Sequence, residues 1–271
     1  MQLRVHAGVN HINFLGKAQS FGALHQFYDR HSFSIFHSSN RHSNNRTGHT
    51  VAISKLSTVE PLYFPANSGS LVDTVSFFNF DNYSVSGTGY YRLKQYLNLG
   101  IGAAVMYENY RQRDEAITGL SGAAFSFYKH QLSASLNYNK VENVFERLEG
   151  TTGKIYGEWI NTYSPNTPSF LKLLFKFTWN KLIPENGNFS ARTKFGVSAN
   201  NFSPFAPFGI DGFLNVRGIG KRVDRRTASF ILNTEYRQSF WNHKYFTLQT
   251  AAFVDYGTLR SPGDNYDRYF P

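Results

Sequence analysis

The sequence contains no cysteine and only 2 methionines among its 271 residues. The missing cysteine excludes a disulfide framework and any metal site built on thiolates. Long apolar runs are missing too, since even the stretch 171–177 is interrupted by Lys172 and Lys176. A membrane-spanning helix needs about 20 consecutive apolar residues. A spanning β-barrel remains compatible, because alternation of lipid-facing and lumen-facing residues averages to a mildly polar chain.

Neither the N-terminal residues nor the net charge identifies a compartment or a binding partner. The first ten residues lack the apolar segment of a signal peptide, so we expect a secreted form to carry one upstream. The formal net charge of +10 suits nucleic acid, anionic lipid head groups or a solvated face equally well.

Aromatic residues and glycine are abundant, with 26 Phe, 17 Tyr and 22 Gly, and this composition favours strands and turns over helices. Apolar and polar residues alternate with a period of two over 97–108, 132–139, 171–180, 230–237 and 246–256. Clusters of turn-forming residues separate these stretches at 40–48, 65–70, 111–118, 164–168 and 184–188. The sequence therefore predicts an all-β antiparallel chain of about twelve or thirteen strands.

The predicted strands are long, and several reach ten residues or more. Soluble sandwiches favour about five or six residues per strand, whereas tilted membrane-spanning strands need about nine to eleven. Aromatic residues near strand ends are typical of an interfacial girdle, and the candidates are Tyr107, Tyr110, Trp159, Tyr163 and Trp179. We predict one transmembrane β-barrel domain over residues 1–271.

Catalytic and metal-binding motifs are weak. Gly100-Ile101-Gly102 lies within a strand rather than before a helix, so it forms no phosphate loop. Gly119-Leu120-Ser121-Gly122 lacks the spacing of a serine-hydrolase elbow. Several histidines lie between His25 and His49 without helical spacing or carboxylate support, and we expect no metal site. We therefore predict no catalytic residues, no metal and no cofactor.

Three ordered segments resemble the BamA and TamA superfamily of outer-membrane barrels, which includes the bacterial surface antigens and the two-partner secretion transporters. They are F-A-P-F-G-I-D-G-F-L-N-V-R-G-I at 205–219, N-T-E-Y-R at 233–237 and F-V-D-Y-G at 253–257. Two further segments resemble the family more loosely: 13–20 as the entry to the first strand and 149–158 as a mid-barrel strand. The resemblance implies a sixteen-stranded barrel preceded by periplasmic domains, with a long loop folded into the lumen.

The resemblance assigns the tip of that loop to Val216, Arg217, Gly218 and Ile219. It implies that Arg217 pairs with Asp255 and Glu235, and that Gly212, Asn233 and Gly257 support the motif. Face parity places both carboxylates on the polar face of their strands. A planar guanidinium can bond two carboxylates at once, so we expect the loop to be held inside the lumen.

This sequence departs from the family pattern in three ways. Ile219 replaces the aromatic residue that follows Val-Arg-Gly, and Asp211-Gly212 replaces paired glycines. The chain also stops about fourteen residues after Asp255, where the family adds about three strands. We therefore expect a barrel truncated at its C-terminus, without the upstream periplasmic domains.

The resemblance implies a non-enzymatic outer-membrane factor of a Gram-negative bacterium that inserts or exports client proteins. Its implied partners are outer-membrane lipids including lipopolysaccharide, client polypeptides, and periplasmic chaperones or accessory lipoproteins, with no nucleic acid. Two alternatives within membranes are a passive pore and a barrel-borne lipase. An alternative of another class is a soluble β protein that binds carbohydrate or nucleic acid through basic and aromatic residues. Lys221, Arg222, Arg225 and Arg226 are either a phosphate-binding group or a solvated loop.

Overall fold

The computed structural model describes residues 5–14, 16, 19–28, 30–39, 46–64, 74–113, 124–144, 147–163, 169–184, 186–199, 208–210, 215–217, 224–243, 245–260 and 267–269. The chain divides into two compact units. The first unit comprises Met1–Leu93, Leu99–Ala134 and Glu158–Phe170, and the second comprises Lys94–Asn98, Ser135–Gly157 and Leu171–Pro271.

The described residues form fifteen strands and no helix. The strands are β1 (Val5–Phe14), β2 (Gln19–Tyr28), β3 (Arg30–Ser39), β4 (Thr47–Phe64), β5 (Thr74–Lys94), β6 (Leu97–Gln112), β7 (Ala124–Val144), β8 (Arg147–Asn161), β9 (Phe170–Ile183), β10 (Gly187–Ser198), β11 (Phe208–Ile210), β12 (Asp224–Arg226), β13 (Ala228–His243), β14 (Phe246–Arg260) and β15 (Asp267–Tyr269). No described helix is long and apolar enough to cross a membrane.

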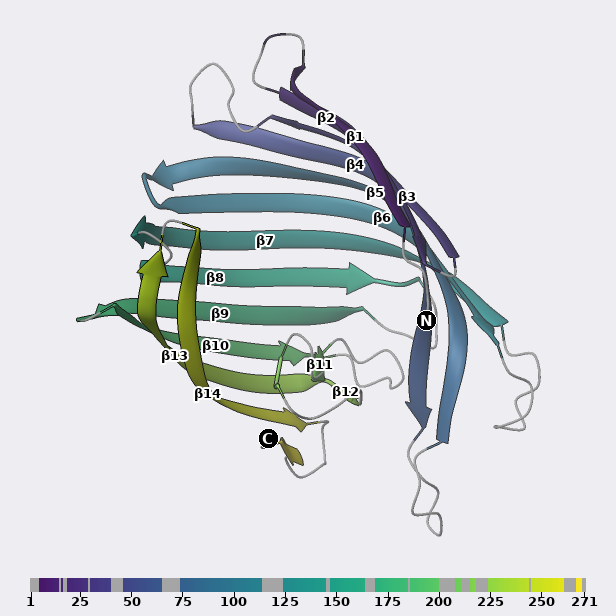
Figure 1. Ribbon diagram of the computed structural model, residues 1–271. Helices are drawn as coiled ribbons and strands as arrows, with labels where there is room; N and C mark the ends of the chain where they lie inside the picture. Colours follow the sequence, from purple (N-terminus) through teal and green to yellow (C-terminus); the bar gives the residue numbers. More distant parts are fainter. Residues whose placement is uncertain are drawn as a thin grey trace. The chain divides into compact units, whose positions relative to one another are not determined.

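Thirteen of these strands form one sheet in which each strand is hydrogen-bonded to the next, in the order β1 to β10, then β13, β14 and β15 (Figure 1). The pairs whose register is defined are antiparallel, such as β9 with β10 and β13 with β14. The all-β, antiparallel prediction and the predicted number of strands are therefore confirmed. Strands of 12 to 21 residues from β4 to β10 also confirm the predicted strand length.

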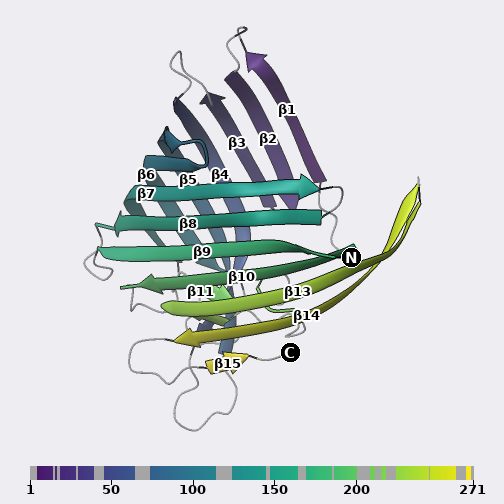
Figure 2. The same cartoon turned by 90° about the vertical axis from the view of Figure 1, so that its left-hand side faces the viewer.

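The short strands β11 and β12 pair with each other and lie outside the main sheet. They occur in the long connection between β10 and β13. The strand β11 contacts β13 and β14 (Figure 2), and β12 contacts β14. All of these elements belong to the second unit. This connection is the segment that carries Arg217.

The two faces of the second unit differ as the alternation predicts. Five residues of β9 keep between 39% and 49% of their surface exposed: Leu171, Leu173, Phe175, Phe177 and Trp179. In β10, Phe195 and Val197 pair with Phe175 and Leu173 and are also exposed. In a β-sandwich such a face would be buried against a second sheet. The opposite face carries the polar residues, and the connection with β11 and β12 contacts it.

The first unit shows the same pattern. Ile53, Val85, Ile101 and Val105 are each more than half exposed. Tyr107 of β6 contacts Tyr128 of β7, with their ring centroids 4.9 Å apart. Each of the two units therefore has an exposed apolar face.

Two details of the sequence interpretation are wrong. Tyr110, which we expected in an outward aromatic girdle, is only 7% exposed, and its hydroxyl donates to the buried Glu108 at 3.1 Å. Its position near a strand end suggested the girdle, but its parity places it on the polar face. The segment 13–20 is not the entry to the first strand, because Asn13 and Phe14 end β1 whereas Gln19 begins β2. The segment 149–158 lies within β8, as expected.

Candidate functional site

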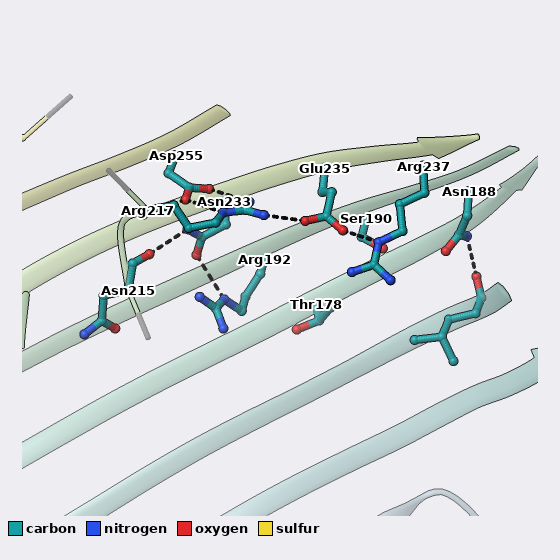
Figure 3. Close-up of a pocket in the computed structure, with 11 residues that line it drawn as sticks. Thr178, Asn188, Ser190, Arg192, Asn215, Arg217, Asn233, Glu235, Arg237 and Asp255 are labelled. Carbon is teal, nitrogen blue, oxygen red and sulfur yellow. Dashed lines mark hydrogen bonds and ion pairs between the residues drawn. The ribbon is translucent and has the colours of Figure 1, made fainter. Parts of the chain in front are cut away.

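Arg217 lies between the two carboxylates that the sequence singles out (Figure 3). Its guanidinium donates from Nε to Oδ2 of Asp255 at 2.8 Å and from Nη2 to Oδ1 at 2.9 Å. The remaining Nη1 donates to Oε2 of Glu235 at 2.5 Å. The side chain of Asp255 is fully buried and that of Glu235 is 17% exposed. One planar cation therefore satisfies two acids, one of them with bidentate geometry.

The backbone of the loop is held at the same place. The backbone N–H of Arg217 donates to Oδ2 of Asp255 at 2.9 Å. Two residues earlier, the carbonyl of Asn215 accepts from Nδ2 of Asn233 at 2.7 Å. Between them, Val216 is fully buried in an apolar cluster with Ile231 and Leu259. We call residues 215–217 the loop anchor.

Strand pairing explains why the two acids meet at one point. Asn233 of β13 is the direct partner of Asp255 in β14, and Glu235 is two residues further along β13. Residues two apart on a strand share a face, so Asn233, Glu235 and Asp255 all face the loop anchor.

Other groups complete the electrostatics of the site. The Arg217 guanidinium carbon lies 3.7 Å from the centre of the Phe253 ring, which is a favourable cation–π distance. Arg237 donates from Nε to Oε1 of Glu235 but is more exposed than Arg217. The hydrogen bond with Asp255 raises the pKa of Arg217 above its already high usual range, against the opposing effect of burial. Arg217 therefore remains a cation.

The structure brings together Val216, Arg217, Asn233, Glu235 and Asp255. Gly257 lies two residues beyond Asp255 in β14, paired with Ile231. Other predicted positions lie outside the described residues, so their placement stays a prediction: Gly212, Gly218, Ile219, Lys221 and Arg222.

Sequence reasoning missed several residues that fix the loop. Nζ of Lys194 donates to Oδ1 of Asn215 at 3.1 Å, and Nε of Arg192 donates to Oδ1 of Asn233 at 3.0 Å. Phe208 of β11 is only 5% exposed and its ring lies against Gly196 of β10. Arg192 and Lys194 are two residues apart in β10 and share a face, but no local pattern indicates which residues a distant loop will contact.

Four of the described histidines lie in two pairs. Nε2 of His25 lies 3.2 Å from Nδ1 of His31, and Nε2 of His49 lies 3.1 Å from Nδ1 of His37. Among the described residues, no three His, Asp or Glu side chains are grouped so as to hold a metal ion.

No family model and no curated protein matches this sequence. Solved structures that share its fold include BamA and CdiB. BamA from Haemophilus ducreyi, solved without POTRA domains 1–3, superposes with a TM-score of 0.73 at 16% identity, covering 95% of this chain and 55% of that one. CdiB from Escherichia coli superposes with a TM-score of 0.62 at 11% identity, covering 97% of this chain and 50% of that one.

This chain thus spans about half the length of each of these proteins. The fold that this chain shares with BamA and CdiB agrees with the resemblance drawn from the sequence.

Proposed function

We propose that this chain is the transmembrane barrel region of a factor that inserts or exports other proteins at the outer membrane of a Gram-negative bacterium. The observation that carries the proposal is the contact of Arg217 with both Asp255 and Glu235. The fold shared with BamA and CdiB supports it, as do the exposed apolar faces, which suit contact with lipid hydrocarbon.

The proposed mechanism involves no bond cleavage and no cofactor. A strand of a client polypeptide pairs with an exposed strand edge, which supplies a row of backbone donors and acceptors. Pairing is favourable inside a membrane because no water is present to satisfy those groups. The loop anchor keeps the long connection against the polar face, so that the loop does not compete with the client. Outer-membrane lipids including lipopolysaccharide, and periplasmic chaperones or accessory lipoproteins, are the proposed partners.

The test is depletion of the protein in its own organism, with complementation by the wild-type gene, by Arg217→Ala or by Arg237→Ala. We expect depletion to reduce the amount of other folded outer-membrane barrels or of one secreted polypeptide, measured by unheated gel electrophoresis and by analysis of the medium. Arg217→Ala should complement poorly. Arg237→Ala, which alters a more exposed contact with the same Glu235, is the matched control and should complement well.

Unchanged client assembly and unchanged secretion in the depleted cells would refute the proposal. Two further measurements separate it from the alternatives within membranes. A steady single-channel conductance without any client phenotype would indicate a passive pore, and cleavage of phospholipid by the purified protein would indicate a lipase. Stability in buffer without detergent would instead indicate the soluble binding protein.

A further inference from the structure

A cavity of about 510 Å³ lies beside the loop anchor on the polar face of the second unit. It is distinct from the cavity that contains Arg217. Four cationic side chains line it, and they come from three strands: Lys154 of β8, Lys176 of β9, and Arg192 and Lys194 of β10. None of the described residues that line it is acidic. Its neutral polar lining includes Asn137, Asn139, Thr152, Thr178 and Asn215, and Tyr138 and Gly153 complete the lining.

Two of these cations oppose each other directly. Lys176 and Lys194 are paired residues in the β9–β10 ladder and face the same cavity. Like charges at directly opposed positions destabilise a sheet. Two lysines at these positions therefore repel each other and destabilise the sheet, and a bound anion would remove this repulsion.

We propose that this cavity binds a phosphate-bearing anion, either a free phosphate compound or the phosphorylated head group of a lipid. Adjacent strands lie about 4.8 Å apart, so cations on three neighbouring strands form a compact group. A phosphate or diphosphate concentrates several negative oxygens in such a space, and the amides and hydroxyls of the lining are suitable donors to those oxygens. An extended acidic peptide fits less well, because its carboxylates on one face repeat only about every 6.7 Å.

The cavity is coupled to the loop anchor through shared residues. It shares Thr178, Arg192 and Asn215 with the cavity that contains Arg217. Lys194 holds the side chain of Asn215, and Arg192 holds Asn233, which in turn binds the Asn215 carbonyl. An anion in the cavity would therefore contact side chains that position the loop anchor. This binding site does not depend on the assembly function proposed above.

The experiment is isothermal titration of the purified protein, in nanodiscs of phosphatidylcholine, with pyrophosphate and with inorganic phosphate. Lys176→Gln should weaken pyrophosphate binding about tenfold or more, because it removes a charge-assisted contact. The matched control is Lys172→Gln, four residues earlier on β9 and outside the cavity lining, which should change binding by no more than about twofold. Adding phosphatidic acid to the nanodiscs distinguishes the sources: competition with pyrophosphate indicates a lipid head group, and no competition indicates a free phosphate compound.

Thermal unfolding supplies a second readout. Without an anion, Lys176→Gln should unfold at a higher temperature than the wild type, because the repulsion with Lys194 is removed. The same variant should lose the stabilisation that pyrophosphate gives the wild-type protein. A variant that is merely misfolded would unfold at a lower temperature.

Three results would overturn the proposal. They are no binding of pyrophosphate or phosphate by the wild-type protein, equal weakening by Lys176→Gln and Lys172→Gln, and tighter binding of a polyglutamate peptide than of pyrophosphate.

Discussion

At the scale of single residues, Arg217 differs from an ordinary surface cation in the environment of its partners. Its own side chain is 37% exposed, whereas that of Asp255 has no exposed surface. A fully buried carboxylate is costly unless it is paired and hydrogen-bonded. Arg217 supplies Asp255 with two side-chain donors and one backbone donor.

Replacing Arg217 with alanine should lower the free energy of unfolding by about 1–3 kcal/mol. Breaking a fully buried ion pair costs about 3–5 kcal/mol, and we expect a smaller loss here because water reaches part of the guanidinium. Arg217→Lys should recover only part of the loss, since an ammonium group cannot contact both acids with the same geometry. The free energy of unfolding of both variants is measured by urea unfolding in lipid vesicles.

Arg237→Ala is the control for this prediction. It removes a cation from the same Glu235, but its side chain is 57% exposed, so the expected loss is below about 1 kcal/mol. Equal losses for Arg217→Ala and Arg237→Ala would show that the contact with Asp255 contributes nothing particular to stability.

At the scale of elements, β11 packs against the sheet at a glycine, where the ring of Phe208 lies against Gly196 of β10. Adding a Cβ at Gly196 would place it 2.6 Å from two ring carbons of Phe208, closer than such atoms approach in real structures. Because Phe208 is buried, its ring cannot move aside without displacing β11. Gly196 thus allows Phe208 of β11 to lie directly on the polar face of β10.

Gly196→Ala should therefore destabilise the protein by about 1–3 kcal/mol, the usual cost of overpacking. Gly153→Ala is a matched control in β8, because its added Cβ would lie 3.9 Å from the nearest atom, an ordinary contact. The double variant Gly196→Ala/Phe208→Ala should lose less than the sum of the two single variants, because the ring that clashes is gone. Strict additivity, measured by urea unfolding in vesicles, would contradict the proposed contact.

The sequence predicts elements well and their tertiary contacts less well. Strand type, length and face follow from the period of two, so the positions of Glu235 and Asp255 on the polar face could be predicted from local pattern. Pairing Arg217 with them required the resemblance to a family, because the partners are 18 and 38 residues distant in the chain. The contact of Phe208 with Gly196 has no such signal, and the burial of Tyr110 depends on parity rather than on its position near a strand end.

At the scale of the whole molecule, the exposed apolar faces determine which solvent suits this protein. Phe177 and Thr178 are neighbours in β9 that lie on opposite faces, and Phe177 is 40% exposed. A large apolar surface of this kind is unfavourable in water and suits a bilayer.

Phe177→Arg should lower the free energy of unfolding in vesicles by about 2–4 kcal/mol, the cost of a cation near the bilayer midplane. Thr178→Arg places the same side chain on the polar face and should cost clearly less. The comparison is made by equilibrium urea unfolding in vesicles. Similar losses for both variants would show that the face bearing Phe177 does not contact lipid.

The burial of Val216 beside the charged Arg217 restricts how the connection can be seated. A shift by one position in one direction would bring Val216 onto the two acids, and a shift by one position in the other direction would bring the Arg217 guanidinium onto Ile231 and Leu259. Both mismatches are unfavourable, so adjacent residues of opposite character permit one alignment only. The alternation of one apolar and one charged residue therefore fixes the register of the loop anchor on β13 and β14 to a single residue.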